Sequence, residues 1–551
     1  MRTEFCSAAE NKVHVKKKSE CKGALKPNMH IADGLDSFFT IMAYMSSLSE
    51  ISPFTLVLTL AAFILSAIYL LCPYQIFKKM GVPGPTPFPL VGTFHHYLKG
   101  FRELDEECFK KYGRIWGLYE GRQPVLMVAD TSMLKQILVK DCLESFTNHR
   151  VFTNNGIFDD ALTTIEDEQW KRVRNVLSPT FSGGKIKQMC PLIQRCADVL
   201  VRNLHELCQS GKPLDLKEIF GAYSMDVIGS TAFSMDVDSQ NNPKDPFVVN
   251  GKSILKINFL NPLVILIFLF PFLSRPLESM GVSLFPKKAS HFFTRIVQQM
   301  KKQRQKGLHD MGRVDFLQLM VDVQLSENAS NGKLSSSEKY LTDSELEAQA
   351  ILFLLAGYET SSTAITFVAY CLACNPDVQT KVQQEIDRFL PNDTLPSYEI
   401  LKQMEYLDMV VSESLRMYPP TSRTDRVCKK TTVVNDLVIP KGMVVAAPLW
   451  VLHYDPQYWD EPEEFRPERF TKEAKEARDP YCYLPFGQGP RNCIGMRFAL
   501  ISLKMALCRI LQRYSFHACS ETTIPPKLAK GTILQTEMPL LLKVSERKKA
   551  D

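Results

Sequence analysis

One short segment restricts the possible folds more than any other, the glycine-rich loop Phe486-Gly-Gln-Gly-Pro-Arg-Asn-Cys-Ile-Gly495. It places a single cysteine, Cys493, directly before a helical pattern. The N-terminus of a helix presents backbone N–H groups and a positive dipole end, which stabilise a thiolate over a thiol. Gly487, Gly489 and Gly495 permit positive φ angles and the close approach of a flat ligand to the backbone. The loop therefore predicts a metal site with the cysteine sulfur as ligand.

Two other interpretations of the loop fail. Zinc sites need several ligands, and neither a Cys-x₂-Cys nor a His pair accompanies this cysteine. A dinucleotide site fails because the third glycine is out of register and no strand–helix unit with a downstream acid follows. Cys371 and Cys374 have the spacing of a metal motif, but they lie in a helical pattern without a second pair, so we expect core packing there. Arg491, within the loop, can offer a paired fork of donors to a carboxylate.

Composition indicates one large folded domain. Hydrophobic residues make up 45% and charged residues 23% of the 551-residue chain, which excludes a largely disordered protein. A net charge of +6 is mild, and we find no basic–aromatic stripe, so we expect no nucleic-acid partner. Fifteen cysteines without framework spacing argue for a reducing compartment. Because no interior linker divides them, residues 93–551 are expected to form one domain, mainly α with small β-sheets.

A long uncharged segment, residues 51–77, predicts a single transmembrane helix. Its most apolar part, residues 54–72, would span about 29 Å as a helix, close to the thickness of a bilayer core. A buried core helix is one alternative; a signal peptide is disfavoured, because no clear cleavage site accompanies a run that lies 50 residues into the chain. Lys78 and Lys79 follow the run, whereas residues 31–50 lack Lys and Arg, so the positive-inside rule places the C-terminal part in the cytosol.

The segments around the anchor carry weaker signals. Residues 1–50 are expected to be an N-terminal extension, either disordered or the product of an upstream start. Residues 78–92 form a proline-rich hinge, whose alternating prolines favour an extended, non-helical chain that serves as a linker or as a spacer. A second apolar run, residues 257–274, predicts a surface that dips into the membrane interface or covers an apolar pocket, with a core helix pair as the alternative.

The spacing Phe486-x-x-Gly-x-Arg-x-Cys-x-Gly495 resembles the haem-binding loop of the cytochrome P450 superfamily. The resemblance implies the P450 fold and haem b as cofactor, with the Cys493 thiolate as axial iron ligand. It covers nearly all of residues 51–551 and is closest to family 3, subfamily A, as segments such as residues 356–360 and 489–500 indicate. Residues 93–551 would then be a haem-thiolate catalytic domain.

Two further motifs match the structural core of that family. Glu413-Ser-Leu-Arg416 places a carboxylate and a guanidinium on one face of a helical pattern, although a solvated surface pair is the usual explanation for such spacing. Phe465-Arg-Pro-Glu-Arg-Phe470 resembles the family's meander motif. The resemblance implies that Arg469 joins Glu413 and Arg416 in an ion cluster that supports the cysteine loop.

A long helical pattern begins at a capping box, Thr342-x-x-Glu345, and continues through Ala356-Gly-Tyr-Glu-Thr360. Gly357 destabilises a helix by about 1 kcal/mol relative to alanine. It serves either close helix packing or, by leaving out a side chain, room for dioxygen beside Ala356. The resemblance implies that Glu359 and Thr360 organise protons for the bound oxygen.

The remaining site residues are also carried over from the resemblance. Five of them, with Phe486 of the cysteine loop, are implied to contact the haem and chiefly its propionates: Trp170, Arg174, Arg426, Arg491 and His149. His149 stands where the subfamily usually has an arginine. The substrate-pocket candidates, with Ala356, are Phe152, Phe158, Thr163, Leu355, Thr421 and Ile533.

The implied function is a membrane-bound haem-thiolate monooxygenase of the endoplasmic reticulum. It would oxidise lipophilic substrates (steroids, drugs, other xenobiotics) by hydroxylation or dealkylation with O₂. Electrons would come from NADPH through NADPH–cytochrome P450 reductase, with cytochrome b5 as a second partner and the lipid bilayer as anchor. A patch of cations is a candidate docking surface: Lys171, Arg172, Lys429, Lys430 and Arg497. A haem-thiolate isomerase of an endoperoxide and a non-enzymatic haem-binding protein are the alternatives.

Overall fold

The structure is a computed structural model of the chain. It describes residues 52–151, 156–254, 273–280, 285–306, 315–329 and 340–547, together with isolated positions between 263 and 270. The chain divides into two compact units, residues 1–69 and 70–551. The predictions on residues 1–50, on most of the apolar run 257–274 and on Phe152 lie outside the described residues.

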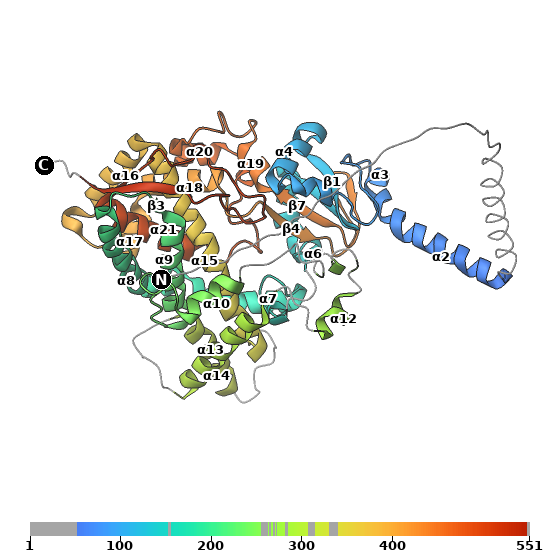
Figure 1. Ribbon diagram of the computed structural model, residues 1–551, viewed down its shortest axis with the longest axis horizontal. Helices are drawn as coiled ribbons and strands as arrows, with labels where there is room; N and C mark the ends of the chain where they lie inside the picture. Colours follow the sequence, from blue (N-terminus) through green and yellow to red (C-terminus); the bar gives the residue numbers. More distant parts are fainter. Residues whose placement is uncertain are drawn as a thin grey trace, which may run out of the picture. The chain divides into compact units, whose positions relative to one another are not determined.

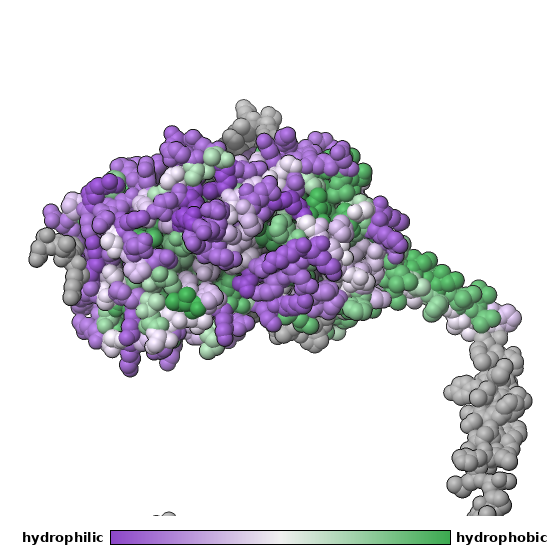
Figure 2. Space-filling model, turned by 90° about the horizontal axis from the view of Figure 1, so that it is seen from above, coloured by the Kyte–Doolittle hydropathy of each residue, from purple (hydrophilic) through white to green (hydrophobic). Residues whose placement is uncertain are grey.

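A continuous apolar helix makes up most of the described part of the first unit. α2 (Pro53–Leu71) contains no charged residue and has no buried side chain. Figure 2 shows it as a hydrophobic rod. Together with η1 (Cys72–Gln75) and α3 (Ile76–Met80) it belongs to a helical stretch that is long and apolar enough to cross a membrane. The stretch ends at Gly81, whose left-handed conformation (φ 69°) is typical of a helix C-cap.

The second unit is mainly helical, as predicted, and α9, α18 and α21 are among the helices that pack against its long helix α15 (Figure 1). In chain order, the first α-helices after α3 are α4 (Phe101–Tyr112), α5 (Thr131–Lys135), α6 (Cys142–Ser145), α7 (Asp167–Leu177), α8 (Gly183–Gln209), α9 (Leu216–Phe233) and α10 (Pro246–Ile254). Those that follow are α12 (Ser274–Ser279), α13 (Lys287–Gln305), α14 (Phe316–Ala329), α15 (Asp343–Cys374), α16 (Pro376–Phe389), α17 (Tyr398–Gln403), α18 (Glu405–Met417), α19 (Leu449–Tyr454), α20 (Lys472–Ala477) and α21 (Met496–Leu511).

The described strands form three small sheets, which confirms the predicted fold class. The largest has the order β1 (Ile115–Glu120), β2 (Gln123–Val128), β7 (Val444–Pro448), β4 (Arg423–Val427), with β2 and β7 parallel and the other neighbours antiparallel. The others are β3 (Leu214–Asp215), β9 (Leu541–Glu546), β8 (Tyr514–His517) and the hairpin β5 (Thr432–Val434), β6 (Leu437–Ile439). In Figure 1, β1, β4 and β7 lie with α4 on one side of the unit.

The helix α15 forms the centre of the largest core cluster. Its capping box is present: Thr342 Oγ1 accepts a hydrogen bond from the Glu345 N–H at 3.2 Å, and the Glu345 carboxylate accepts one from the Thr342 N–H at 2.9 Å. Thirty-two residues give the helix a length of about 48 Å. Although α15 is long and apolar enough to span a membrane, most of it is buried in the protein, so it is a core helix.

In the proline-rich segment, residues 78–80 belong to α3 and residues 82–87 are non-helical, and the segment is bonded to the large sheet. The Gly117 N–H, in β1, donates to the Pro83 carbonyl oxygen at 2.8 Å, and the Thr93 N–H donates to Tyr119 at 2.7 Å. Gly84 lies so close to the Gly117 carbonyl that a Cβ at position 84 would collide with it. Pro83 and Gly84 are therefore packed against β1.

Candidate active site

The cysteine loop is closed by its own backbone and ends at α21. The Cys493 N–H donates to the Phe486 carbonyl oxygen at 2.9 Å, and the Asn492 N–H donates to Gly489 at 3.1 Å. Cys493 lies three residues before the first residue of α21 and is accessible to solvent. Enough protein nevertheless surrounds the sulfur that burial raises the pKa of the thiol, against the lowering effect of the Gly495 and Met496 amides. A bound metal cation offsets this cost, because it deprotonates a coordinating thiol.

Gly489 places the loop against the rest of the protein. Its φ of +80° is one that residues with side chains rarely adopt. A Cβ there would collide with the Leu138 carbonyl oxygen, in the π-helical turn η3 (Gln136–Lys140). The glycine is thus required twice, once by the backbone conformation and once by the close approach of η3.

Three predicted haem contacts meet at this loop. Arg174, on α7, donates to the carbonyl and side-chain oxygens of Asn492, each at 2.9 Å. Arg491 is buried and donates to the carbonyl oxygens of Leu162 (3.1 Å) and Ile165 (2.7 Å). Its guanidinium carbon lies 4.4 Å from the centroid of the Trp170 ring, so the two side chains form a cation–π contact that holds Arg491 in place.

Arg426 and His149 complete the cluster. Arg426 is 1% exposed and donates to the Asp425 carbonyl oxygen at 2.6 Å. His149 Nδ1 lies 3.1 Å from the Asp425 carboxylate and 3.4 Å from Arg426. Burial lowers the pKa of His149, more than Asp425 raises it, so the imidazole is neutral at pH 7. It therefore does not replace the positive charge of an arginine at this position.

These residues fit the two carboxylates of haem b. Burial and the nearby Arg426 lower the pKa of Arg491 to about 9, and burial lowers the pKa of Arg426 as well. The Nε atoms of both guanidinium groups are buried and have no hydrogen-bond partner among the described residues. Buried cations without a carboxylate partner are costly, and an anionic ligand removes that cost. A thiolate ligand and a set of cations beside it match the iron and the propionates of one haem.

The oxygen-activation segment of α15 presents Ala356 and Thr360 rather than Gly357. Ala356 is exposed although the helix around it is buried, and Thr360 Oγ1 donates to the Ala356 carbonyl oxygen at 2.5 Å. A Cβ at Gly357 would collide with Ile228 of α9. Gly357 therefore allows α9 and α15 to pack closely, which is the first of the two roles considered for it.

Glu359 is bonded to residues distant in sequence rather than to Thr360. Its carboxylate lies 2.9 Å from Lys217 Nζ and accepts a hydrogen bond from Gln535 at 3.1 Å. Lys217, in the first turn of α9, also donates to Ser362 (2.7 Å) and Thr363 (2.8 Å). No local pattern could reveal Lys217 or Gln535, because they lie 142 and 176 residues from Glu359.

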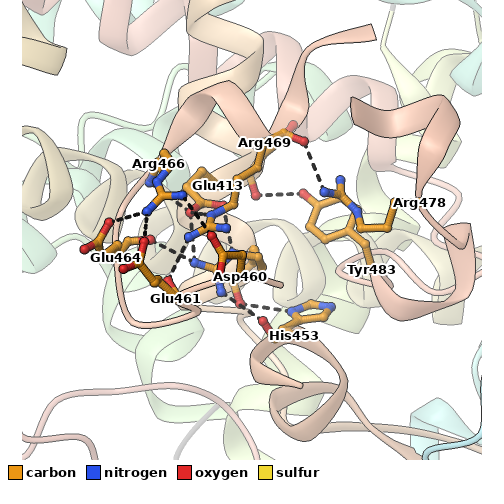
Figure 3. A network of polar contacts seen from close by, with 11 residues as sticks. Glu413, His453, Asp460, Glu461, Glu464, Arg466, Arg469, Arg478 and Tyr483 are labelled. Atoms are coloured by element: carbon orange, nitrogen blue, oxygen red, sulfur yellow. Dashed lines mark hydrogen bonds and ion pairs between the residues drawn. The ribbon is translucent and has the colours of Figure 1, made fainter. Parts of the chain in front are cut away.

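The ion cluster is present and buried (Figure 3). Arg416 donates two hydrogen bonds to the Glu413 carboxylate, from Nε (2.7 Å) and Nη2 (2.8 Å), and Arg469 Nε donates to the same group at 3.2 Å. Both Glu413 and Arg416 are 0% exposed, so the alternative of a solvated surface pair is wrong. All three residues therefore act inside the fold.

His453, which the motifs did not reveal, connects this cluster to the cysteine loop. Arg416 donates to the His453 carbonyl oxygen at 2.9 Å, and His453 Nε2 accepts a hydrogen bond from the Leu484 N–H at 2.9 Å. Leu484 precedes the loop residue Phe486 by two positions. Burial lowers the pKa of His453 to about 3, which keeps the imidazole neutral and Nε2 free to accept.

The substrate-pocket candidates are only partly brought together. Thr421 and Ile533 form an isolated β-bridge, so they are neighbours in space. Phe158 is buried, with its ring centroid 4.4 Å from that of Phe285, whereas Thr163 is exposed. Leu355 is 8% exposed, next to the exposed Ala356.

Comparison with known proteins gives the family. The sequence model of the cytochrome P450 family matches residues 82–544. The chain is 52% identical over 493 residues to cytochrome P450 3A9 of Rattus norvegicus, covering 90% of this chain and 97% of the relative. It is 51% identical over 493 residues to cytochrome P450 3A7 of Homo sapiens, with the same coverage, and 53% identical over 474 residues to cytochrome P450 3A13 of Mus musculus, covering 86% of this chain and 93% of the relative.

Proteins of this subfamily are microsomal haem-thiolate enzymes of the endoplasmic reticulum membrane that oxidise steroids and xenobiotics. The thiolate loop, the buried guanidinium cluster and these identities agree, and the chain belongs to the cytochrome P450 family, within subfamily 3A, as a haem-thiolate monooxygenase.

Proposed function

We propose specific roles for the residues of this monooxygenase. The observation that carries the proposal is the group of buried guanidinium side chains beside a solvent-accessible cysteine at a helix N-terminus. Cys493 holds the iron, while Arg174, Arg426 and Arg491 attract the propionates. When bound, haem supplies dioxygen activation and the transfer of one oxygen atom to the substrate.

The remaining residues orient groups around that chemistry. Trp170 keeps Arg491 in place, and Phe486 accepts the hydrogen bond that closes the loop. His149 offers a neutral imidazole beside the guanidinium groups. Glu413, Arg416 and Arg469 support the loop through His453. The proposed substrate pocket contains Phe158, Thr163, Leu355, Ala356, Thr421 and Ile533, with Phe152 from outside the described residues.

Thr360 and Glu359 are proposed to move protons at this site. The Thr360 hydroxyl now donates to the Ala356 carbonyl oxygen, so it must turn before it can donate to a ligand. The Glu359 carboxylate is held by Lys217 and Gln535, so it must leave one of them and take up a proton from solvent before it can pass a proton to Thr360 Oγ1. Lys217 thus holds the acid in its resting position.

The replacement Thr360→Ala is expected to uncouple NADPH consumption from product formation by about tenfold or more, because a positioned proton donor is lost. The measurement uses the full-length protein in liposomes with NADPH–cytochrome P450 reductase. NADPH consumption is compared with steroid products quantified by mass spectrometry. Thr360→Ser, which keeps the hydroxyl, is the matched variant and should retain coupling. Equal coupling in all three proteins would exclude the proton-relay role.

The same assay tests the function itself. Steroid oxidation that requires both NADPH and the reductase is the expected result. Reductase-independent rearrangement of an endoperoxide would favour the isomerase instead. A haem-loaded protein without product on a broad panel of steroids and xenobiotics would favour a non-enzymatic haem-binding protein.

The domain arrangement and the identity of the redox partners are also part of the proposal. Residues 51–77 form the anchor, residues 78–92 a spacer, and residues 93–551 the catalytic domain on the cytosolic side. The reductase, and cytochrome b5 as a second partner, dock on the cationic patch defined above. Four of its five cations are already paired: Lys171 with Glu168, Arg172 with Glu345, Lys429 with Asp167 and Lys430 with Glu144. The patch is therefore less positive than its sequence implies, and a modest contribution is expected.

Reversing two of these charges, with Lys429→Glu and Lys430→Glu together, is expected to slow reductase-driven turnover about threefold and to reduce its dependence on salt. The reason is that charges at the rim of an interface act mainly on the association rate. Turnover is measured between low and physiological ionic strength. The matched control reverses the exposed pair Lys110 and Lys111 of α4. If the two double variants behave alike, the patch does not bind the reductase.

A further inference from the structure

A cavity of about 280 Å³ lies beside the Glu359–Lys217 pair, between α9, α15 and residues 534–539. It is separate from the cysteine loop, none of whose residues line it. Its polar walls come from Asp215, Lys217, Thr363, Thr366, Gln535, Thr536 and Glu537. Gln535, Glu537 and Met538 are exposed, so this side of the cavity faces solvent.

The ammonium group of Lys217 has no hydrogen left for a ligand. Its three N–H donors match Glu359 (2.9 Å), Ser362 (2.7 Å) and Thr363 (2.8 Å). The positive charge is also balanced by the Glu359 carboxylate. The lining also contains two carboxylates, those of Asp215 and Glu537, so its acidic groups outnumber its one ammonium group.

Asp215 is the carboxylate that gains most from a cation. It caps α9, where its side chain accepts a hydrogen bond from the Lys217 N–H at 3.0 Å. Partial burial raises the pKa of Asp215, against the lowering effect of the Glu218 and Lys217 amides and of the Lys217 charge, so burial disfavours the charged form. Within the described part of the chain, no lysine or arginine forms an ion pair with Asp215.

The other polar side chains of the wall direct their donors elsewhere. The Thr366 hydroxyl donates to the Ser362 carbonyl oxygen at 2.7 Å, and the Gln535 amide donates to Glu359 at 3.1 Å. Each of these side chains keeps an oxygen atom that can accept a hydrogen bond. Phe367, Leu534 and Met538 supply an apolar wall.

We propose that this cavity binds a small organic cation, an amidinium or ammonium group attached to a short apolar body, with Asp215 as its ion-pair partner. A volume of 280 Å³ equals about nine water molecules at 30 Å³ each, which sets the size of the ligand near nine non-hydrogen atoms. The donors of the cation meet the oxygen atoms, and its apolar body packs on Phe367 and Leu534. This site does not depend on the roles proposed above for the haem residues.

Three probes of nine non-hydrogen atoms test the charge requirement: benzamidinium, neutral benzamide and anionic benzoate. Binding to the full-length, haem-loaded protein in detergent is measured by calorimetry, and the Soret band is recorded in the same samples. Benzamidinium is expected to bind without moving the Soret band, at least about tenfold more tightly than the other two probes. Equal binding of the three probes, or no binding of benzamidinium, would refute the cation site. Binding seen only with a Soret shift would place the probe at the haem and would refute it too.

The variant Asp215→Asn removes the charge but keeps the helix cap, because asparagine caps helices as well as aspartate does. It is expected to weaken benzamidinium binding about tenfold, the loss typical of a charge-assisted hydrogen bond. Asp130→Asn, at the cap of α5, is the matched control and should leave binding unchanged. Glu537→Gln, at an exposed position, gives a second test that does not touch the core and should weaken binding to a smaller degree. Unchanged binding in both cavity variants would overturn the proposal.

Discussion

Replacing Cys493 with serine is expected to abolish the thiolate-type Soret band of the CO-bound ferrous protein, together with all monooxygenase activity. Serine preserves the size of the side chain, but its hydroxyl does not give the iron the electron-rich thiolate that O–O cleavage requires. The measurement is the CO difference spectrum of dithionite-reduced membranes that contain the full-length protein.

Cys519→Ser is the matched control, since Cys519 is a half-exposed free cysteine in another part of the described chain. It should keep the thiolate-type band at full intensity. A variant at position 493 that still shows this band would mean that another cysteine binds the iron. That result would also contradict the roles proposed for the arginines around Cys493.

The second large effect is expected from Glu413→Ala, which should destabilise the catalytic domain by about 3–5 kcal/mol. Arg416 would be left as an uncompensated cation in the core, because the Glu413 carboxylate is the acidic group that pairs with it and with Arg469. Chemical unfolding of the haem-loaded protein measures the loss. The spectrum of the CO complex should deteriorate at lower denaturant concentration than in the unchanged protein.

Glu399→Ala provides the comparison, because its partner Lys187 and Glu399 itself are both exposed. That variant should unfold at nearly the same denaturant concentration as the unchanged protein, since solvent screens exposed ion pairs. If the two variants lost equal stability, burial of the Glu413 cluster would not be the source of its effect.

Local spacing explains which parts of the site were predictable from sequence. The capping box at Thr342 and the pair of Glu413 with Arg416 depend on residues three positions apart, and the structure contains both. The cysteine loop is likewise a continuous segment. Such features depend on few residues, so a short pattern is enough to specify them.

Contacts between distant segments could not be predicted in the same way. Lys217 reaches Glu359 and His453 reaches Leu484 only after α9, α15 and α19 have packed. A glycine in a helix is compatible with a ligand space or with a close neighbour, and the sequence alone could not reveal that Ile228 lies against Gly357. The Asp215 cavity has no sequence signature at all, because its wall is assembled from three separate segments.

The guanidinium groups around the cysteine loop make the fold and its prosthetic group thermodynamically linked. Arg426 and Arg174 both disfavour the positive charge of Arg491, so the polypeptide alone holds cations that repel one another, two of them buried. A dianionic ligand that binds the folded chain and not the unfolded chain relieves this repulsion and adds its binding free energy to the stability of the fold. A larger supply of the prosthetic group during synthesis is therefore expected to increase the fraction of newly made chains that keeps the native state.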